Sequence, residues 1–505
     1  MGGFKVVRLA NAVAPHSGGL RTALRELGTG YREAGHEPVL IVPGSDPHDE
    51  QTCQGRVITV PAPIVPKTGG YRLIVARRSL RRLLERLEPD RLEVSDRTTL
   101  RWTGEWARAH GVRSMMVSHE HLSGLLRELG PPGLPTERLA DRMNRATAAS
   151  FDVVVCTTDW AAEEFRRLGV PNLVRVPLGV DLTSFSPSRY DEELRSSLVR
   201  PGEHLLVHCS RLSPEKRPDR PIAALAELRR RGVPAVLAVV GDGPRRRALE
   251  AQAAGLPVRF FGHVSARGLV ASLLATADVA IAPGPVETFG LAGLEALASG
   301  TPVVANRASA LPEVIGPAGL AVEDDPKAYA DAVEHLLARE RSWRRSLARA
   351  QAERFGWSGA VEGFLRAHDV TGGPPGRSDP RRSQVAPAAG RYCVVDEPTG
   401  GGGVVNEPAG RASAVGEPTG RTSAVGEPTG RWNAVDEPTG PGGALGEPTG
   451  RTSAVSEPTG RWNAVDEPTG PGGALGEPTG RTSAVSEPAG RTGAVGEAAA
   501  SGDAG

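Results

Sequence analysis

The chain has 505 residues, more than one hydrophobic core usually organises, so two or more domains are expected. Only 39% of the residues are hydrophobic, while 63 are Gly and 43 are Pro, which predicts a sizeable segment without a core. The net charge of +1, from 60 Lys and Arg against 59 Asp and Glu, excludes a general electrostatic attraction to nucleic acid or anionic lipid.

The cysteines and the hydropathy pattern indicate a cytoplasmic chain. Cys53, Cys156, Cys209 and Cys393 are scattered without metal-ligand spacing, which favours reduced thiols over a disulfide framework or a structural zinc. No apolar run reaches the roughly 18 residues that cross a bilayer. The start, MGGFKVVRLANAV, is interrupted too early for a signal peptide.

Residues 1–180 are predicted to form one α/β domain. A strand at 5–10 is followed by Gly18-Gly19, a helix over 20–35 and a second strand at 38–44. Further strands at 91–95, 114–119 and 152–158 alternate with helices that include 73–87 and 160–169. This alternation is typical of a parallel sheet with helices on both faces.

Residues 181–355 repeat the pattern as a second doubly wound domain. Its predicted strands are 204–210, 235–241, 258–262, 279–283 and 302–305. The helices between them are predicted at 220–232, 245–255, 269–277 and 289–300. Two such domains leave a cleft between the carboxyl ends of their sheets, where ligands of open α/β folds bind.

The remaining chain is predicted to hold a helix, 356–371, that crosses back to the first domain, and a disordered repeat tail, 372–505. From Glu397 to Glu487 the tetrapeptide Glu-Pro-Thr/Ala-Gly recurs every ten residues. Blocks 421–450 and 451–480 differ only at Gly426 versus Ser456. Each decapeptide has too little apolar surface to offset the entropy of ordering, so a solvated tail is preferred over a solenoid or a binding array.

The stretch 285–305, PVETFGLAGLEALASGTPVVA, carries two glutamates eight residues apart, Glu287 and Glu295. Glu287 is expected in the loop after a strand, and Glu295 in the first or second turn of the following helix. Backbone N–H groups at a helix start receive phosphates or hydroxyls, and carboxylates accept hydrogen bonds from vicinal hydroxyls of sugar or ribose. For an arbitrary pair of glutamates at this spacing, the favoured interpretation would be a solvated helix face. Here the surrounding sequence favours a binding site.

This stretch resembles the donor-binding motif of the family-4 retaining glycosyltransferases of the GT-B fold (glycosyltransferase group 1), which include the similar actinobacterial phosphatidylinositol mannosyltransferases. The resemblance extends over residues 5 to about 370. It implies an acceptor-side domain followed by a nucleotide-sugar domain, with Glu287 on the transferred sugar and Glu295 on the ribose. The other donor contacts that it implies in this stretch are Thr288, Phe289, Gly290 and Leu291.

Arg211 and Lys216, in CSRLSPEKRPDR, follow the first strand of the second domain, as an Arg and a Lys do in this family. Departure of a nucleoside diphosphate develops negative charge on the β-phosphate, which two fixed cations stabilise most in the transition state. The competing interpretation is a solvated basic loop. If the two cations serve the diphosphate, no metal is required, and no acidic metal-binding motif is present.

Two further positions of the first domain match the family. Gly18 and Gly19 follow the first strand, where glycine lets the backbone approach a diphosphate, although most Gly-Gly pairs mark turns. His119, in MMVSHEHLSG, matches a His that contacts the donor sugar, which implies positioning and transition-state stabilisation rather than general-base catalysis. His121 is its competitor, and either His alone is more often structural.

His263 and Val264, in FFGHVS, match the loop that holds the nucleobase through backbone groups. Two glycine motifs are discounted. GDGP at 241–244 lacks the third glycine of a dinucleotide fingerprint. Lys67-Thr68-Gly69-Gly70 is similar to the ADP-glucose loop of starch and glycogen synthases but does not follow the first strand.

A basic amphipathic helix is predicted over 72–87. One face carries Leu73, Leu80, Leu83, Leu84 and Leu87, and the other carries Arg78, Arg81, Arg82 and Arg86. This surface suits peripheral contact with an anionic membrane on its cytoplasmic face. A helix that packs its leucines on the sheet and leaves its arginines in water is at least as well supported.

The sequence therefore predicts a retaining hexosyltransferase without a bound cofactor. Its co-substrate would be a nucleotide diphosphate sugar of the GDP or UDP type, with mannose as a candidate sugar, and its acceptor a glycolipid, a glycan or a small molecule. Nucleic acid is not an expected partner. The alternatives are a nucleotide-sugar epimerase or phosphorylase on the same fold, and a noncatalytic scaffold with a repeat interaction tail.

Overall fold

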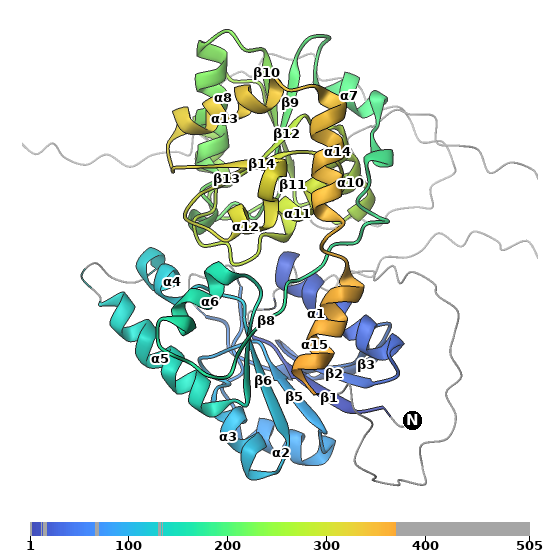
Figure 1. Ribbon diagram of the computed structural model, residues 1–505, viewed down its shortest axis with the longest axis vertical. Helices are drawn as coiled ribbons and strands as arrows, with labels where there is room; N and C mark the ends of the chain where they lie inside the picture. Colours follow the sequence, from blue (N-terminus) through green and yellow to red (C-terminus); the bar gives the residue numbers. More distant parts are fainter. Residues whose placement is uncertain are drawn as a thin grey trace, which may run out of the picture. The chain divides into compact units, whose positions relative to one another are not determined.

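The computed structural model describes residues 3–11, 13, 18–65, 70–129, 133 and 135–369, all of which belong to one unit of the chain (Figure 1). The predicted repeat tail, Cys393 and Lys67-Thr68-Gly69 lie outside the described residues. No helix in the described part of the chain is long and apolar enough to cross a membrane.

The first sheet has eight strands in the order β3-β4-β2-β1-β5-β6-β7-β8. They are β1 (Lys5–Leu9), β2 (Glu37–Gly44), β3 (His48–Thr52), β4 (Gly55–Pro61), β5 (Arg91–Val94), β6 (Arg113–Ser118), β7 (Val153–Cys156) and β8 (Leu173–Arg175). All neighbours run parallel except β3, which pairs antiparallel with β4. The short connection through Cys53 and Gln54 forces this reversal, since parallel strands need a long crossover.

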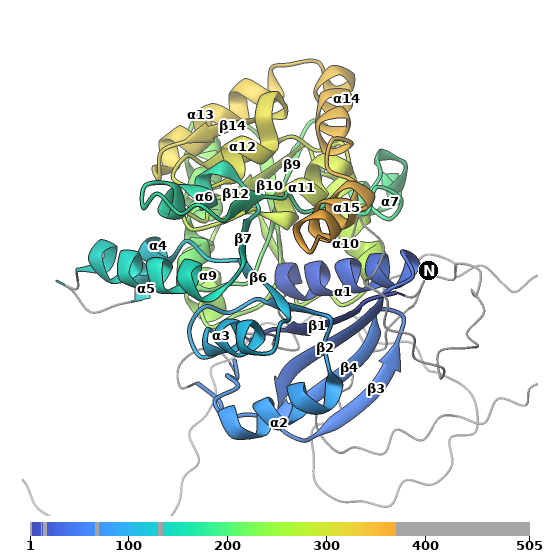
Figure 2. The ribbon, with the colours of Figure 1, turned by 60° about the horizontal axis from the view of Figure 1, so that its bottom comes forward.

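Helices cover both faces of this sheet, as Figure 2 shows for α1 and α2. They are α1 (Gly18–Glu33), α2 (Arg77–Leu87), α3 (Trp102–Ala109), α4 (Leu122–Leu129), α5 (Thr136–Ser150) and α6 (Asp159–Arg166). Strand β1 alternates between the faces: Val6 packs in a cluster with Tyr31 of α1, and Val7 in a cluster with Leu84 of α2. Strand β1 is thus buried on both sides, and Arg8 within it is buried as an ion pair with Glu93 at 2.8 Å.

The second sheet is entirely parallel, with the strand order β11-β10-β9-β12-β13-β14. Its strands are β9 (His204–Cys209), β10 (Ala235–Val240), β11 (Val258–Gly262), β12 (Val279–Ala282), β13 (Val303–Asn306) and β14 (Gly319–Val322). Its longer helices are α7 (Glu192–Leu198), α8 (Asp219–Arg230), α9 (Arg246–Gln252), α10 (Arg267–Thr276), α11 (Leu291–Ala298), α13 (Pro326–Leu337) and α14 (Arg341–Ala352). Short helices are α12 (Leu311–Ile315), η1 (Pro187–Arg189), η2 (Pro214–Lys216) and η3 (Gly316–Ala318).

The predicted α/β class with two doubly wound sheets is confirmed. In each sheet the order of connection reverses beside one strand: β1 lies between β2 and β5, and β9 lies between β10 and β12. Ligands of such sheets bind outside the carboxyl ends of the strands at this reversal. The loops after β1, β5, β9 and β12 are therefore where a site is expected.

The last described helix, α15 (Trp357–Ala367), packs on elements of the first sheet. A Cβ on Gly30 of α1 would come 2.2 Å from Cγ2 of Val361, so the two helices touch through a glycine. Just beyond α15, His368 is fully buried, with Nε2 3.3 Å from Oε2 of Glu93. Burial alone would raise the pKa of Glu93, but Arg8 and the hydrogen bonds from His368 and Tyr31 lower it to about 2.

The helix predicted over 72–87 is wrong in its first turn. α2 begins at Arg77, because Ile64 and Arg72 form an antiparallel bridge and Asn11 Oδ1 accepts a hydrogen bond of 2.9 Å from the Ile74 N–H. Leu73 thus lies outside the helix. The remaining leucines of the face, Leu80, Leu83, Leu84 and Leu87, pack in the core cluster beneath the sheet.

Candidate functional site

The loop after β12 turns sharply into α11 at Gly290. This residue has a φ of 81°, a conformation that favours glycine, and a Cβ there would lie 2.5 Å from Cδ2 of the buried Leu311. The backbone of the loop is held by a hydrogen bond of 2.8 Å from the Ala310 N–H to the Glu287 carbonyl. The FGL sequence thus starts a helix at Leu291, and the buried Phe289 anchors the turn in the core.

Glu287 and Lys216 meet although they are 71 positions apart in the sequence. Lys216 Nζ lies 2.6 Å from Glu287 Oε1, and both side chains are partly exposed, at 27% and 22%. Lys216 ends η2, in the loop after β9, and Glu287 lies in the loop after β12. Because β9 and β12 are parallel neighbours, the two loops emerge at the same edge.

Arg211 lies in the same loop as Lys216 and has three polar partners. Its Nη2 is 2.5 Å from Glu215 Oε1, its Nε donates to Ser213 Oγ at 3.2 Å, and its Nη1 donates to the hydroxyl of Tyr71. The guanidinium also lies 5.1 Å from the centre of the Tyr71 ring. These contacts fix a cation at the carboxyl edge of the second sheet.

The glycines of the discounted GDGP motif have a packing role beside Arg211. A Cβ on Gly241 would lie 1.9 Å from the Ser210 carbonyl oxygen, and one on Gly243 would lie 2.5 Å from that of Leu212. Only glycine permits this close approach of two backbone segments. The motif therefore supports the loop that carries Arg211.

The loop from β12 also contacts the loops of the first sheet. Thr288 Oγ1 donates a hydrogen bond of 2.7 Å to the carbonyl oxygen of His119, and the Thr288 carbonyl accepts one of 2.9 Å from Thr158 Oγ1. A Cβ on Gly124 would lie 3.1 Å from Val286 Cγ1. The structure thus brings His119 next to the Glu287 loop.

His119 and His121 have different surroundings. His119 Nε2 lies 3.1 Å from Ser95 Oγ, and burial lowers the pKa of His119 to about 4, so its ring is neutral at pH 7. The ring of His121 lies 4.1 Å from that of Trp160 at an angle of 33°, and its Nδ1 lies 3.6 Å from Glu164. A neutral His119 can donate or accept a hydrogen bond but carries no positive charge.

Glu295 is the fifth residue of α11, and burial raises its pKa to about 7. Arg267 and Arg25 oppose this shift, while Asp181 and Glu26 add to it. Arg267 in turn lies 3.7 Å from Glu26 and 3.8 Å from Asp181. The carboxyl group therefore titrates near neutral pH.

Gly18 and Gly19 form the first turn of α1, where backbone N–H groups lack helical partners. Both are exposed, and a Cβ on Gly19 would lie 3.7 Å from Cδ1 of Leu291, the first residue of α11. His263 and Val264 follow β11; His263 is exposed and Val264 is half-buried against the core. No cluster of three or more His, Cys, Asp and Glu side chains suited to a metal occurs among the described residues.

Sequence reasoning missed Tyr71, Glu215 and Arg267. Glu215 lies four positions after Arg211, and this spacing of opposite charges was a usable signal. Tyr71 reaches Arg211 from 140 positions away, and Arg267 reaches Glu26 and Asp181 from other elements. No local sequence pattern predicts such long-range contacts.

Comparisons with known proteins identify the family of the chain. Residues 18–179 match the model of the glycosyl transferase 4-like domain, and residues 203–339 match that of the glycosyl transferases group 1. A GDP-mannose-dependent alpha-(1-6)-phosphatidylinositol dimannoside mannosyltransferase of Mycobacterium tuberculosis is 50% identical over 364 residues, 72% of this chain and 95% of the relative. A GDP-mannose-dependent alpha-mannosyltransferase of Mycolicibacterium smegmatis is 30% identical over 351 residues, 67% of this chain and 90% of the relative.

Solved structures share the fold at low sequence identity. Sucrose-phosphate synthase from Thermosynechococcus elongatus matches with a TM-score of 0.61 and 20% identity, over 73% of this chain and 98% of that one. The glycosyltransferase WaaG of lipopolysaccharide biosynthesis matches with a TM-score of 0.54 and 19% identity, over 73% and 100%. The chain belongs to the group 1 glycosyltransferases and has their GT-B fold.

Proposed function

We propose that this enzyme transfers mannose from GDP-mannose to a phosphatidylinositol mannoside. The observation that carries the proposal is the 50% identity to the dimannoside mannosyltransferase of Mycobacterium tuberculosis, over 95% of that protein's length. The first acceptor to test is therefore phosphatidylinositol dimannoside, with an α-(1-6) linkage. A relative named for the monomannoside, from Mycolicibacterium smegmatis, is 32% identical over 358 residues, so the monomannoside is the second acceptor.

In the proposed donor complex the second domain binds the nucleotide sugar. Arg211 and Lys216 stabilise the charge that develops on the departing diphosphate, and Glu287 accepts hydrogen bonds from the mannose hydroxyls. The 2.6 Å contact between Lys216 and Glu287 supports their placement in one site. Donor binding then replaces part of this ion pair by contacts to phosphate and sugar.

The remaining proposed donor contacts are on two helices and one loop. Glu295 holds the ribose, and the loop at His263 and Val264 holds the base. The first turn of α1, at Gly18 and Gly19, offers backbone N–H groups to the diphosphate. This role is supported by the closeness of Gly19 to α11: a Cβ on Gly19 would lie 3.7 Å from Cδ1 of Leu291, which begins that helix.

His119 is proposed to position the donor sugar. The low pKa of its ring, about 4, argues against a cationic role at neutral pH and supports hydrogen bonding by a neutral imidazole. The His119 carbonyl bonds to Thr288, next to Glu287, which supports a shared sugar contact. The domain limits near residues 180 and 355 remain part of this proposal.

Contact with an anionic membrane face is proposed as electrostatic, since the acceptor is a lipid. The arginines of α2 are exposed, while its leucines pack inside the first domain. The expected result is sedimentation with anionic liposomes at low salt and release at high salt. If anionic liposomes at low salt leave the sedimentation of the protein unchanged, this result would contradict the proposed membrane contact.

The transfer itself is tested with the full-length protein and radiolabelled GDP-mannose, with UDP-glucose as the competing donor. The proposal expects a trimannoside from phosphatidylinositol dimannoside and loss of that product in Glu287→Gln. Product from UDP-glucose alone would overturn the donor assignment. An epimer or a sugar phosphate formed without acceptor would instead identify an epimerase or a phosphorylase, and no turnover of any donor would favour a scaffold.

A further inference from the structure

A cavity of about 320 Å³ lies at the edge of the second sheet opposite to the candidate donor site. His204, which begins β9, and Asp278, which precedes β12, both line it. Arg211 and Glu287 follow the other ends of the same two strands. The cavity is therefore separated from the donor site by the length of the strands, roughly 20 Å for a six-residue strand.

Arginines dominate the lining of this cavity. They are Arg195, Arg339, Arg341 and Arg344, against the two carboxylates Asp278 and Glu203. Glu203 is also shared with Arg229 at 3.6 Å. The lining therefore carries more positive than negative charge.

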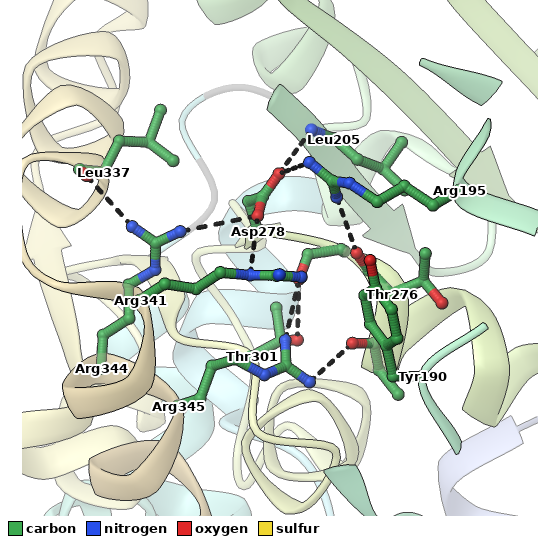
Figure 3. Close-up of polar contacts among 12 residues, drawn as sticks. Tyr190, Arg195, Leu205, Thr276, Asp278, Thr301, Leu337, Arg341, Arg344 and Arg345 are labelled. Atoms are coloured by element: carbon green, nitrogen blue, oxygen red, sulfur yellow. Dashed lines mark hydrogen bonds and ion pairs between the residues drawn. The ribbon is translucent and has the colours of Figure 1, made fainter. Parts of the chain in front are cut away.

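Asp278 is the only buried carboxylate among these lining residues, and four groups already contact it. It accepts hydrogen bonds of 2.9 Å from the Leu205 N–H and from Arg195 Nη2. Arg344 and Arg341 approach its other oxygen at 3.5 and 3.7 Å. Figure 3 shows the three arginines converging on this one side chain.

The guanidinium groups retain donors for a further anion. Arg344 is 5% exposed; its Nη1 bonds to carbonyl groups at the end of α13, and its Nε has no hydrogen-bond partner among the described residues. Arg341 is 46% exposed and makes no hydrogen bond within the described part of the chain. Burial and repulsion from Arg341 lower the pKa of the adjacent Arg345 to about 10, as expected where positive charge is in excess.

We propose that this arginine cavity binds the phosphate group of a small anionic ligand. The planar guanidinium presents paired donors that match phosphate oxygens, and several such groups around one cavity favour a multiply charged anion. Its volume lies at the lower end of ligand pockets, roughly 300–1,000 Å³, which suits a phosphate compound rather than a large cofactor. Arg341 supplies the accessible contact, and Arg344 contributes its buried positive charge beside the cavity.

The test is binding of inorganic phosphate to the full-length protein, by thermal shift and titration calorimetry. Arg341→Ala and Arg341→Glu are expected to weaken binding about tenfold or more, since each removes a charge-assisted contact. Arg259→Glu makes the same charge change at an exposed position of β11 and is expected to bind like the parent protein. Melting temperatures without phosphate report on folding, and Arg341→Ala removes no hydrogen bond.

Phosphate also suits the candidate donor site, so Arg211→Ala is the second control. Binding that survives in Arg211→Ala and is lost in Arg341→Ala supports the proposal. The reverse pattern, or equal binding by Arg341→Ala and the parent protein, overturns it.

A flotation assay distinguishes the two sources of phosphate. Arg341-dependent flotation with phosphatidylinositol vesicles, and not with phosphatidylcholine vesicles, identifies a lipid headgroup. Arg341-dependent binding of inorganic phosphate without flotation identifies a free phosphate compound. The absence of both phosphate binding and flotation would overturn the proposal.

Discussion

Lys216 and Glu287 are joined by an ion pair of 2.6 Å at the carboxyl ends of β9 and β12. Removal of one fixed donor from a developing oxyanion costs about 10²–10³ in kcat. Lys216→Ala is therefore expected to lower kcat by about 10²-fold, as measured by initial rates at saturating donor. Lys327→Ala, at an exposed position on α13, is the matched control and should leave kcat unchanged. Equal rates for the two variants would show that Lys216 does not assist departure of the diphosphate.

A second prediction at the residue scale is that Glu295 makes donor binding depend on pH. Its raised pKa of about 7 means that the carboxylate, the proposed acceptor for ribose hydroxyls, is lost as pH falls through 7. Between pH 8 and pH 6 the ionised fraction falls roughly tenfold. The KM for the donor is therefore expected to rise toward pH 6 in the parent enzyme, with little change in Glu295→Gln. The same rise in both proteins would assign the pH dependence to another group.

The contribution of Glu295 to folding stability changes with pH in the opposite direction to its contribution to donor binding. The folded-state pKa of about 7 exceeds the ordinary value of 4.5, so between these values the native state holds the extra proton. Stability from Glu295 is therefore lost as pH rises through 7, when a partly buried charge must form. In the proposed donor complex, binding at pH 8 thus uses a carboxylate that weakens the fold.

At the scale of one element, the start of helix α11 depends on a single glycine, Gly290. Gly290→Ala would strain a left-handed residue, at about 1–2 kcal/mol, and press a Cβ against Leu311, at about 1–3 kcal/mol. Gly232 has nearly the same φ, 82°, but a Cβ there meets nothing within 4 Å. Denaturant unfolding should therefore show a larger loss of stability for Gly290→Ala than for Gly232→Ala. Equal losses would mean that Leu311 moves aside without cost.

At the scale of the whole molecule, catalysis is expected to need only part of the chain. All proposed donor-site residues lie between Gly18 and Glu295, and the two family models match residues 18–179 and 203–339. The fold includes α15 and the buried His368, so truncation must keep them. A protein ending at residue 380 is expected to retain the kcat and KM of the full chain, measured with the same donor and acceptor. A large loss of kcat would give the repeat segment a role in transfer.

The sequence by itself determined the alternation of strands and helices and the membership of the family. Apolar runs and helix-start residues are local signals, and the spacing of Glu287 and Glu295 is also local. The placement of Arg211, Lys216 and His119 after strands could be predicted for the same reason, because loops at one edge of a parallel sheet follow its strands.

Tertiary structure alone decided what each side chain touches. The start of α2 at Arg77 depends on the Asn11 side chain, and the arginine cavity depends on Arg195 and Arg344 meeting at Asp278. The near-neutral pKa of Glu295 results from burial among charges on other elements. Such contacts join residues far apart in the chain, so strand order and packing determine them. Local sequence periodicity does not predict them.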